Sequence, residues 1–485
     1  MRTIDKLRKT QVVEADIIVL NNLSTFNFSE AAAMLEKNSP TWMTDIMPIQ
    51  MERRESMNTG LRLKYHRLKK RISLEETASG ILSSRELKKI ESGLKEPSLR
   101  DLEALCKKLG ISLAPKENPI GHVLVKNFKT SLLHPQNKGK IMEQYADIHD
   151  HPLLFVNEDI ELEYNIQQIR YFIITGDLDS AEEKLKEMDR FKEFMNQEQF
   201  YLFHKYKGNY HYILNDFETA LKTYQMAEKI APNGSSSSEK GDLFYSIGIT
   251  ATQCWETELA FQYTEMALKI YQQEFIPKRI VECHINMGIT HNRLGNYKIS
   301  IEHYQNASTI GRKLEVEILK FTTEYNLGYN YFLNQQYELA KEHMETALTF
   351  IPPEYIADSL LSYCLIIMSD LELDNLESAK KWGEKGLTLI KSKNLSLDSP
   401  TNQAFKESYI QFMCLIHLIN NNFKEFKHLT LIYLIPSLEN HKNFYELGYF
   451  YSQLGNVYYK QALYEKSAEY YRNSQRAYKN LIRKS

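Results

Sequence analysis

Most of the chain carries apolar residues at the spacing of amphipathic helices, and these helices come in pairs. Between residues 206 and 340 the pattern recurs in four stretches, "YKGNYHYILNDFETA", "SIGITATQCWETELA", "NMGITHNRLGNYKIS" and "NLGYNYFLNQQYELA". In each stretch, apolar positions three and four residues apart flank a short polar turn such as "LND" or "LGN". The pattern predicts hairpins made of two helices.

The four units keep a strict register. Their glycines are forty residues apart, at Gly208, Gly248, Gly288 and Gly328. Nine residues after them come Phe217, Thr257, Tyr297 and Tyr337. Small residues follow at plus twelve and plus nineteen, at Ala220, Ala260, Ser300, Ala340, Ala227, Ala267, Ala307 and Ala347. Small side chains at fixed positions are expected where two helices cross closely, and the residue at plus nine begins the second helix.

Fainter copies of this frame extend the array to about eight hairpins between residues 159 and 482. There the glycine position is occupied by Ile169, Ile367, Cys414 and Gly455. Each hairpin needs a neighbour to bury its other face, so the units are expected to stack. The frame resembles tetratricopeptide repeats with lengthened helices, whereas an unrelated helical bundle would need four registers to agree by accident. The resemblance implies an all-α fold in which the repeats form a right-handed superhelix with a concave inner face.

A second helical module precedes the repeats, in the stretch "LRLKYHRLKKRISLEETASGILSSRELKKIESGLKEPSLRDLEALCKKLGISL". It contains three hydroxyl residues that each stand three positions before a carboxylate, which is the spacing of a capping box. The pairs are Ser73 with Glu76, Ser83 with Glu86, and Ser98 with Asp101. The helices "LEETASGI" and "SSRELKKIE", joined by a short connection, predict a helix-turn-helix in which Leu87 and Ile90 face inward.

This module resembles the repressor-type helix-turn-helix domains of the XRE or lambda-repressor family, in "SSRELKKIESG" and in the turn "ESGLKEPS". The resemblance implies a structural ion pair between Arg67 and Glu91 and a second helix that lies in the major groove of double-stranded DNA. The implied DNA-binding residues are Ser83, Ser84, Arg85, Lys88, Lys89, Ser92 and Lys95. Arg85 is the best candidate for base recognition, because Arg pairs bidentately with guanine O6 and N7. The alternative for each residue is an outward side chain that is only solvated.

Charge also separates this module from the rest of the chain. Thirteen Lys or Arg and seven Asp or Glu lie between Gly60 and Gly110, a net charge of +6 in a chain whose total is −2. A compact basic module beside an acidic body is expected when only one part of a protein meets a polyanion. Two positions depart from the family pattern. Arg71 replaces a common glycine, and His66, interpreted as a histidine at the edge of the core, replaces an apolar residue.

The remaining segments complete a division into four parts. Residues 58–113 form the predicted DNA-binding domain and residues 156–485 the repeat domain. Residues 1–57 are predicted to be a helical extension, either a second, degenerate helix-turn-helix or an arm used for packing or dimerisation. Residues 114–155 are interpreted as a linker and a lead-in helix. The "HDH" at 149–151 lacks the partners that a metal site needs, so no metal or other cofactor is expected.

Composition and the absence of catalytic motifs narrow the class of protein. The five cysteines are scattered and never form CxxC, which favours a reducing cytoplasm over a disulfide framework. The N-terminus "MRTIDKLRKT" lacks the apolar core of a signal peptide, and apolar runs such as "YCLIIM" are too short to span a membrane, so neither secretion nor membrane insertion is expected. The nucleotide-binding, zinc-protease and hydrolase signatures are missing. The chain is therefore predicted to be a cytoplasmic protein that is not an enzyme.

A repressor-type helix-turn-helix followed by a long tetratricopeptide array resembles the peptide-responsive regulators of the RRNPP class, and "SGILSSRELKKIESG" is most like its NprR and PlcR members. The resemblance implies a homodimeric transcription regulator whose binding to an operator is switched by a short signalling peptide in the concave face of the repeats. It fits quorum sensing or a phage or plasmid decision. The alternative is a Rap-like adaptor that sequesters a response regulator or another protein partner.

Positions on the first helix of each hairpin are expected to line the concave face and bind the peptide. The candidates are Asn209, Tyr245, Asn286, Asn292, Tyr325, Asn326 and Tyr329. Asparagine can both donate to and accept from an extended peptide backbone, and the tyrosines would form apolar pockets. The alternative is that these asparagines are solvated. The aromatic-rich last hairpins, "YFYSQLGNVYYKQALYEKSAEYY", are either the dimer surface or simple repeat filler.

Overall fold

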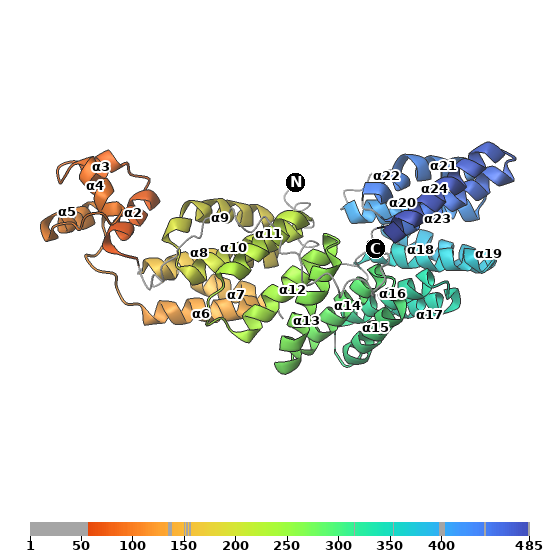
Figure 1. The fold of residues 1–485 in the computed structure, drawn as a ribbon, viewed down its shortest axis with the longest axis horizontal. Coiled ribbons are helices and arrows are strands. Elements are labelled where there is room, and N and C mark those ends of the chain that lie inside the picture. Colours follow the sequence, from red (N-terminus) through yellow and green to blue (C-terminus); the bar gives the residue numbers. More distant parts are fainter. Residues whose placement is uncertain are drawn as a thin grey trace, which may run out of the picture. The chain divides into compact units, whose positions relative to one another are not determined.

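A computed structural model describes residues 57–133, 138–149, 151, 154, 157–314, 316–352, 354–396, 403–440 and 443–483. Within these residues every regular element is a helix, which confirms the all-α prediction (Figure 1). Of the predicted N-terminal extension, only Met57 lies among the described residues. The contacts divide the described chain into a first unit that ends at Thr250 and a second unit that starts at Ala251.

The first unit begins with the helix-turn-helix domain. Its helices are α2 (Thr59–Lys69), α3 (Leu74–Ala78), α4 (Ser84–Glu91) and α5 (Leu99–Leu109). The predicted caps are present, because the hydroxyls of Ser73, Ser83 and Ser98 each accept a hydrogen bond from the backbone N–H three residues later. Leu63, Leu87, Ile90, Leu105 and Leu109 form the centre of a small apolar core.

The lead-in helices and the first repeats complete this unit. The elements are α6 (Pro119–Leu133), α7 (Lys138–His149), α8 (Glu158–Thr175), α9 (Leu178–Arg190), the 3-10 turn η5 (Lys192–Phe194), α10 (Gln197–Ile213), α11 (Phe217–Ile230) and α12 (Ser237–Gln253), which runs through the boundary. Phe128 of α6 packs with Tyr164 and Tyr171 of α8 in one core. The lead-in helices are thus joined to the first hairpin by apolar contact.

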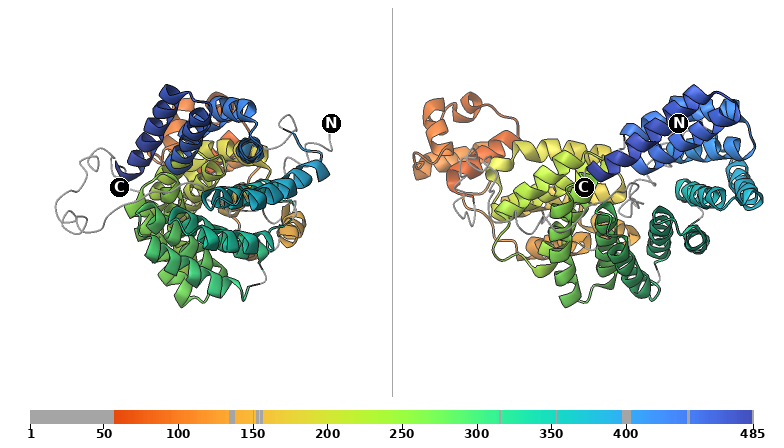
Figure 2. Two further views of the ribbon diagram at one scale, coloured as in Figure 1. Left: turned by 90° about the vertical axis from the view of Figure 1, so that its right-hand side faces the viewer. Right: turned by 45° about the vertical axis from the view of Figure 1, so that its right-hand side comes forward.

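The second unit consists of the remaining hairpins. Its elements are α13 (Thr257–Gln273), α14 (Pro277–Arg293), α15 (Tyr297–Gly311), α16 (Glu317–Leu333), α17 (Tyr337–Leu348), α18 (Ile356–Glu372), α19 (Leu376–Ser392), α20 (Gln403–Ile419), α21 (Phe423–Leu429), the π turn η6 (Thr430–Leu434), α22 (Ile435–Asn440), α23 (Phe444–Lys460) and α24 (Tyr464–Arg483). Helices α23 and α24 lie side by side as the last hairpin (Figure 2).

The helices keep the register that the sequence predicts. The residue nine positions after each anchor is the first residue of the second helix in all eight hairpins, from Leu178 in α9 to Tyr464 in α24. The small residues at plus twelve and plus nineteen of the four strict units, such as Ala260 and Ala307, are completely buried. The glycine anchors are needed for close approach. A Cβ atom on Gly288 would lie 2.5 Å from the ring of Tyr304.

Each turn inside a hairpin contains one residue with a positive φ, seven positions after the anchor. Only two of these residues are glycines, Gly176 and Gly295. The others are Asn215, Trp255, Gln335, Asp374, Asn421 and Ala462. The left-handed conformation closes the turn, and most hairpins adopt it without a glycine.

Within the described part of the chain, no helix is both long enough and apolar enough to cross a membrane.

Candidate functional site

The second helix of the helix-turn-helix, α4, is held at its start by a reciprocal capping box. The backbone N–H of Glu86 donates to Ser83 Oγ at 3.2 Å, and Glu86 Oε2 accepts from the N–H of Ser83 at 3.3 Å. Leu87 and Ile90 are buried, whereas Arg85, Lys88 and Lys89 are exposed. Ser84 is half-buried. The predicted basic face of α4 is therefore exposed.

A buried ion pair fixes α4 against α2. Arg67 Nε donates to Glu91 Oε1 at 2.6 Å, and its Nη2 donates to Oε2 at 2.7 Å. The third nitrogen, Nη1, reaches the carbonyl oxygen of Ile72 at 3.3 Å. The hydrogen bond with Glu91 raises the pKa of Arg67, although burial of the side chain acts to lower it. The ion pair that the family resemblance implied is therefore present, and it is bidentate.

Two of the implied DNA-binding residues, Lys95 and Ser92, already have partners within the protein. Lys95 Nζ lies 2.9 Å from Glu86 Oε1, and this hydrogen bond is the main cause of a Glu86 pKa of about 2. Ser92 Oγ donates to the carbonyl oxygen of Lys89 at 3.1 Å. Both side chains are exposed, so phosphate could replace these surface partners.

The two departures from the family pattern have structural explanations. Arg71 has a φ of 57°, the left-handed conformation for which glycine is favoured. His66 is half-buried, and its Nε2 lies 2.7 Å from Glu158 Oε1 of α8. That partner could not be predicted, because the two residues are 92 positions apart along the chain.

Of the predicted peptide-binding residues, Asn286 and Asn326 occupy equivalent positions on α14 and α16. Both are buried, so neither is a solvated side chain in this structure. Asn286 Nδ2 donates to Thr264 Oγ1 at 2.7 Å, whereas Asn326 Nδ2 donates to the carbonyl oxygen of Thr322 in its own helix at 2.7 Å. The amide oxygen of Asn286 has no hydrogen-bond partner.

Other buried amide oxygens share this property. Among the described residues, the side-chain oxygens without a hydrogen-bond partner include those of Asn209, Asn286, Asn292 and Asn330. Asn330 was missed from the sequence because it stands at a different register from Asn286 and Asn326. Its Nδ2 donates to Ser300 Oγ at 2.8 Å, and Ser300 Oγ donates to the carbonyl oxygen of Gly288 at 2.7 Å. A buried acceptor without a donor lowers the stability of the folded chain.

The predicted tyrosines lie in the interior. Tyr325 and Tyr329 of α16 are stacked with ring centroids 6.5 Å apart, and both are buried. They share one apolar core with Tyr449 and Phe450 of α23. Phe332, at the end of α16, meets Tyr445 with centroids 5.8 Å apart. Protein atoms thus cover the candidate pockets from the side of the last hairpin. Tyr245, on α12, is also buried.

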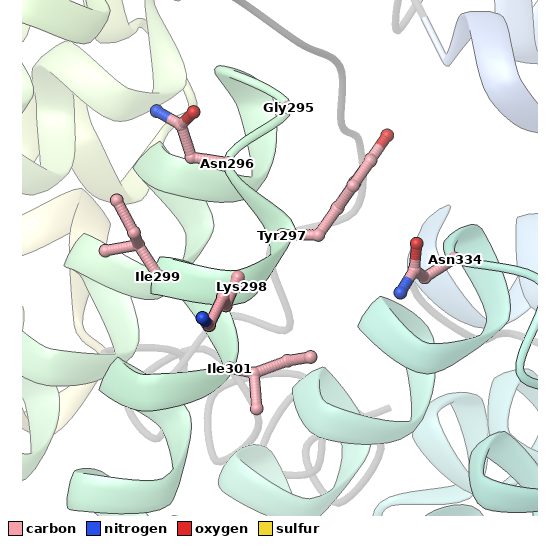
Figure 3. A pocket seen from close by; sticks show the side chains of 7 residues that line it. All are labelled: Gly295, Asn296, Tyr297, Lys298, Ile299, Ile301 and Asn334. Atoms are coloured by element: carbon pink, nitrogen blue, oxygen red, sulfur yellow. The ribbon is translucent and has the colours of Figure 1, made fainter.

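A pocket of about 600 Å³ lies at the turn between α14 and α15 (Figure 3). Its lining residues are Gly295, Asn296, Tyr297, Lys298, Ile299, Ile301 and Asn334. In the close view, Tyr297 and Asn334 extend from neighbouring hairpins. None of the predicted peptide-binding residues lines this pocket.

The described residues offer no cluster of three or more His, Cys, Asp or Glu side chains suited to a metal ion. His149 of the "HDH" stretch instead has its Nδ1 2.9 Å from the Tyr164 hydroxyl, inside the core shared by α7 and α8.

Comparisons with known proteins match both parts of the chain. Residues 63–115 match the helix-turn-helix family model HTH_3, and residues 325–353 match a tetratricopeptide repeat model. The transcriptional activator NprA of Geobacillus stearothermophilus is 26% identical over 419 residues, which are 84% of this chain and 99% of NprA. Response regulator aspartate phosphatase I of Bacillus subtilis is 23% identical over 201 residues, 40% of this chain and 51% of the phosphatase.

Solved structures support the fold of the repeats. The apo form of RapI is similar with a TM-score of 0.60 and 18% identity, over 75% of this chain and 99% of RapI. The apo quorum sensor NprR from B. thuringiensis has a TM-score of 0.59 and 20% identity, over 73% of this chain and 98% of NprR. NprR in complex with its cognate peptide NprX has a TM-score of 0.51 and 19% identity, over 68% of this chain and 96% of NprR. The predicted combination of a repressor-type helix-turn-helix with tetratricopeptide repeats is confirmed, and it is consistent with the RRNPP class.

Proposed function

We propose that this chain, similar in both parts to regulators of the RRNPP class, is a transcription regulator whose DNA binding is switched by a short signalling peptide bound among its repeats. The main support is the alignment with a transcriptional activator along 99% of that protein, at 26% identity. This chain also contains a helix-turn-helix whose second helix exposes Arg85, Lys88 and Lys89. The cytoplasm is the expected location.

The DNA ligand is double-stranded, and α4 supplies the contacts. Arg85 is exposed on the outer face of α4, where a guanidinium can pair with guanine in the major groove. Lys88, Lys89 and Lys95 provide positive charge for phosphates, which fixes position without selecting sequence.

The peptide ligand is expected at the unpaired amide oxygens of α14 and α16. An extended peptide carries backbone N–H groups, and Asn286, Asn292 and Asn330 each hold an acceptor without a donor. These side chains are at most 2% exposed, so a peptide can reach them only if the surrounding helices shift. A ligand that binds only the shifted state moves the population toward it, which is the physical basis of a switch.

A homodimer follows from the size of the DNA-binding domain, because one such domain spans only a few base pairs and two-fold pairs recognise half-sites about 34–36 Å apart. Some tyrosines of the last hairpin fit the interpretation as repeat filler, and others fit the interpretation as a dimer surface. Tyr449 and Tyr458 are buried as filler, whereas Tyr459 and Tyr464 are about 60% exposed. We place the dimer contact at the exposed pair and expect light scattering to give twice the chain mass.

Fluorescence anisotropy of labelled operator DNA, with and without peptide, tests the proposal. The peptides would be synthetic fragments encoded by reading frames next to this gene, first selected by calorimetry. We expect a bound peptide to change operator affinity by about tenfold or more, since coupling energies are typically about 1–3 kcal/mol. A peptide that binds and leaves operator affinity unchanged would refute the switch.

Asparagine variants locate the peptide. Asn286→Ala and Asn292→Ala should each weaken peptide binding by about tenfold or more, because a lost buried hydrogen bond costs roughly 1–3 kcal/mol. Asn286→Ala should also lower stability by about 1 kcal/mol through the lost bond to Thr264. Asn334→Ala, at the exposed end of α16 and in the 600 Å³ pocket, is the matched control. If Asn334→Ala alone weakens binding, the peptide occupies the pocket instead.

A second candidate function is an adaptor that sequesters a response regulator or another protein partner. It is favoured by the similarity to response regulator aspartate phosphatase I. The chain spans about half the length of that relative. A response regulator retained by the purified chain, together with no affinity for any operator fragment, would support the adaptor over the regulator.

A further inference from the structure

Helix α2 has a second polar face, which packs on the first repeat hairpin. Arg62, Tyr65, His66 and Lys69 follow one another at spacings of three, one and three residues, so they share one side of the helix. Their partners on α8 are Glu158 and Glu161. We call these six residues the docking junction. The exposed face of α4 takes no part in it.

Glu158 is the centre of the junction. Its Oε1 accepts a hydrogen bond from Arg62 Nε at 2.6 Å and lies 2.7 Å from His66 Nε2. Arg62 and Glu158 are both buried. Burial alone would raise the pKa of Glu158, but the hydrogen bonds from His66, its own backbone N–H and Arg62 hold that pKa at about 2. The carboxylate is therefore charged and tied to two side chains of the other domain.

Glu161, one turn further along α8, uses both of its oxygens. Its Oε1 pairs with Lys69 Nζ, and its Oε2 accepts from the Tyr65 hydroxyl at 3.2 Å. The ring of Tyr65 meets Phe191 and Phe194 with centroids 5.4 and 5.5 Å away. This aromatic cluster is the apolar part of an interface that otherwise consists of ion pairs and the hydrogen bond from Tyr65.

The chain between the two domains is fastened at the same place. Arg62 Nη1 donates to the carbonyl oxygen of Ser112 at 2.6 Å, and Asn157 Nδ2 donates to that of Lys116 at 3.1 Å. The first turn of α8 is also tied to the next hairpin, because Gln199 Nε2 donates to the carbonyl oxygen of Asp159 at 2.8 Å. Repeats, linker and α2 thus meet at one small cluster.

We propose that the docking junction is the surface through which the repeat domain sets the orientation of the helix-turn-helix domain, and that it opens and closes as one unit. Interfaces between domains permit relative motion unless they are large and apolar, and this one is mainly ionic. A shift of α10 relative to α8 acts on the turn that carries Glu158 through the bond from Gln199. The junction is therefore placed to relay a change in the repeats to α2.

The consequence for DNA rests on the proposed function. A docked domain holds α4 at one angle, so two copies in a dimer fit one separation of half-sites. An undocked domain would be tethered only by the linker and would accept several separations. The undocked domain would also bind the operator more weakly, because it loses more rotational and translational freedom when it binds.

Charge reversal at Lys69 tests the junction, with Lys70 as the control. Lys69→Glu places two carboxylates together at Glu161. Lys70→Glu makes the same change of charge next to it, at an exposed residue. The readout is hydrogen exchange in the full chain, over residues 112–118 and 157–161. We expect Lys69→Glu to speed exchange there by about tenfold relative to Lys70→Glu, since two like charges in a partly buried pair repel each other at a cost on the order of 1.4 kcal/mol or more.

Two further variants make the test specific. Lys69→Glu combined with Glu161→Lys restores opposite charges and should bring exchange back toward the wild-type rate. Lys64→Glu removes the more exposed pair with Glu193 and should act in the same direction as Lys69→Glu, but more weakly. Equal exchange in Lys69→Glu and Lys70→Glu, or no recovery in the swapped pair, would overturn the docking proposal whether or not the chain binds DNA.

Operators with half-sites at different separations test the second step. The wild type should prefer one separation by about tenfold, and Lys69→Glu should flatten the preference to within about threefold while Lys70→Glu keeps it. If hydrogen exchange shows that a variant is undocked but the variant keeps the wild-type preference for one half-site separation, the junction does not set the orientation of the helix-turn-helix. A wild type without affinity for any operator would instead count against the proposed function and leave the exchange result standing.

Discussion

Replacing Gly288 by alanine tests whether the glycine anchors are required by contact between helices. Gly288 lies in the middle of α14, and an added Cβ would come within 2.5 to 2.8 Å of three ring atoms of Tyr304 on α15. Tyr304 is buried, and its hydroxyl interacts with Asn292, so the ring cannot easily withdraw. Gly311, at the end of α15, is the matched control. There the nearest atom to an added Cβ is 3.8 Å away, on Val281.

Two effects of opposite sign determine the size of the change. Alanine favours a helix over glycine by about 0.8–1.0 kcal/mol, which stabilises both variants. Overpacking a filled core lowers stability by about 1–3 kcal/mol, and only Gly288→Ala adds an atom where the core is already filled. We therefore expect Gly288→Ala to lower the free energy of unfolding by up to about 2 kcal/mol and Gly311→Ala to raise it by up to about 1 kcal/mol.

Urea unfolding followed by tryptophan fluorescence would measure both variants. Trp255 and Trp382 lie in the second unit, so they report on the part of the chain that holds both glycines. The midpoint of Gly288→Ala should be lower than that of Gly311→Ala, with similar slopes. If Gly288→Ala is at least as stable as Gly311→Ala, the close crossing at Tyr304 is not what selects glycine at the anchor.

Three more outcomes follow from the side chains described above. Arg85→Ala should weaken the free energy of binding by roughly 1–3 kcal/mol on the operator and by little on random DNA. Lys95→Ala should weaken binding to both DNAs alike and reduce the salt dependence of binding. Equal losses of affinity for Arg85→Ala on the two DNAs would refute its role in base recognition. Arg67→Ala leaves the carboxylate of Glu91 buried without its ion-pair partner and should destabilise the helix-turn-helix by about 3–5 kcal/mol, seen as faster hydrogen exchange in α2 to α5 with an unchanged tryptophan transition. Burial raises the pKa of Glu446 to about 7 despite hydrogen bonds with Gln411 and Asn443, so the folded chain favours the protonated acid and loses stability as pH rises from about 4.5 to 7. Glu446→Gln should therefore be more stable than the wild type by about 1–3 kcal/mol at pH 8 and similar to it near pH 4.5, and urea midpoints at the two pH values would check this sign.

The helices of the hairpins could be predicted because small and aromatic residues there satisfy one local requirement forty residues apart. Crossing helices exclude large side chains, so positions such as Ala260 and Gly288 are restricted whatever the rest of the chain does. The turns could not be predicted in the same detail. Their positive φ is found at Trp255 and Ala462, which carry no sequence signal for that conformation. There the packing of the two helices imposes the backbone angle.

The candidate sites show a similar division. The caps could be predicted from short spacings, and the ion pair of Arg67 with Glu91 from a family motif. The structure contains the caps and the ion pair. The burial of Asn286 and Asn326 depends on how neighbouring repeats cover them, which no local pattern reports. The partner of His66 is 92 residues away in the chain, and single charged residues on a helix do not indicate which distant carboxylate they will meet.

Phe332 on α16 and Tyr445 on α23 meet across more than a hundred residues, and so connect the fifth hairpin to the eighth. In an open array each hairpin touches only its neighbours, and the ends can fray one repeat at a time. Here the last four hairpins form a closed ring of contacts, because losing α23 also uncovers α16. These hairpins should melt in a single step. Deleting α23 and α24 would then loosen a helix far upstream instead of merely shortening the array.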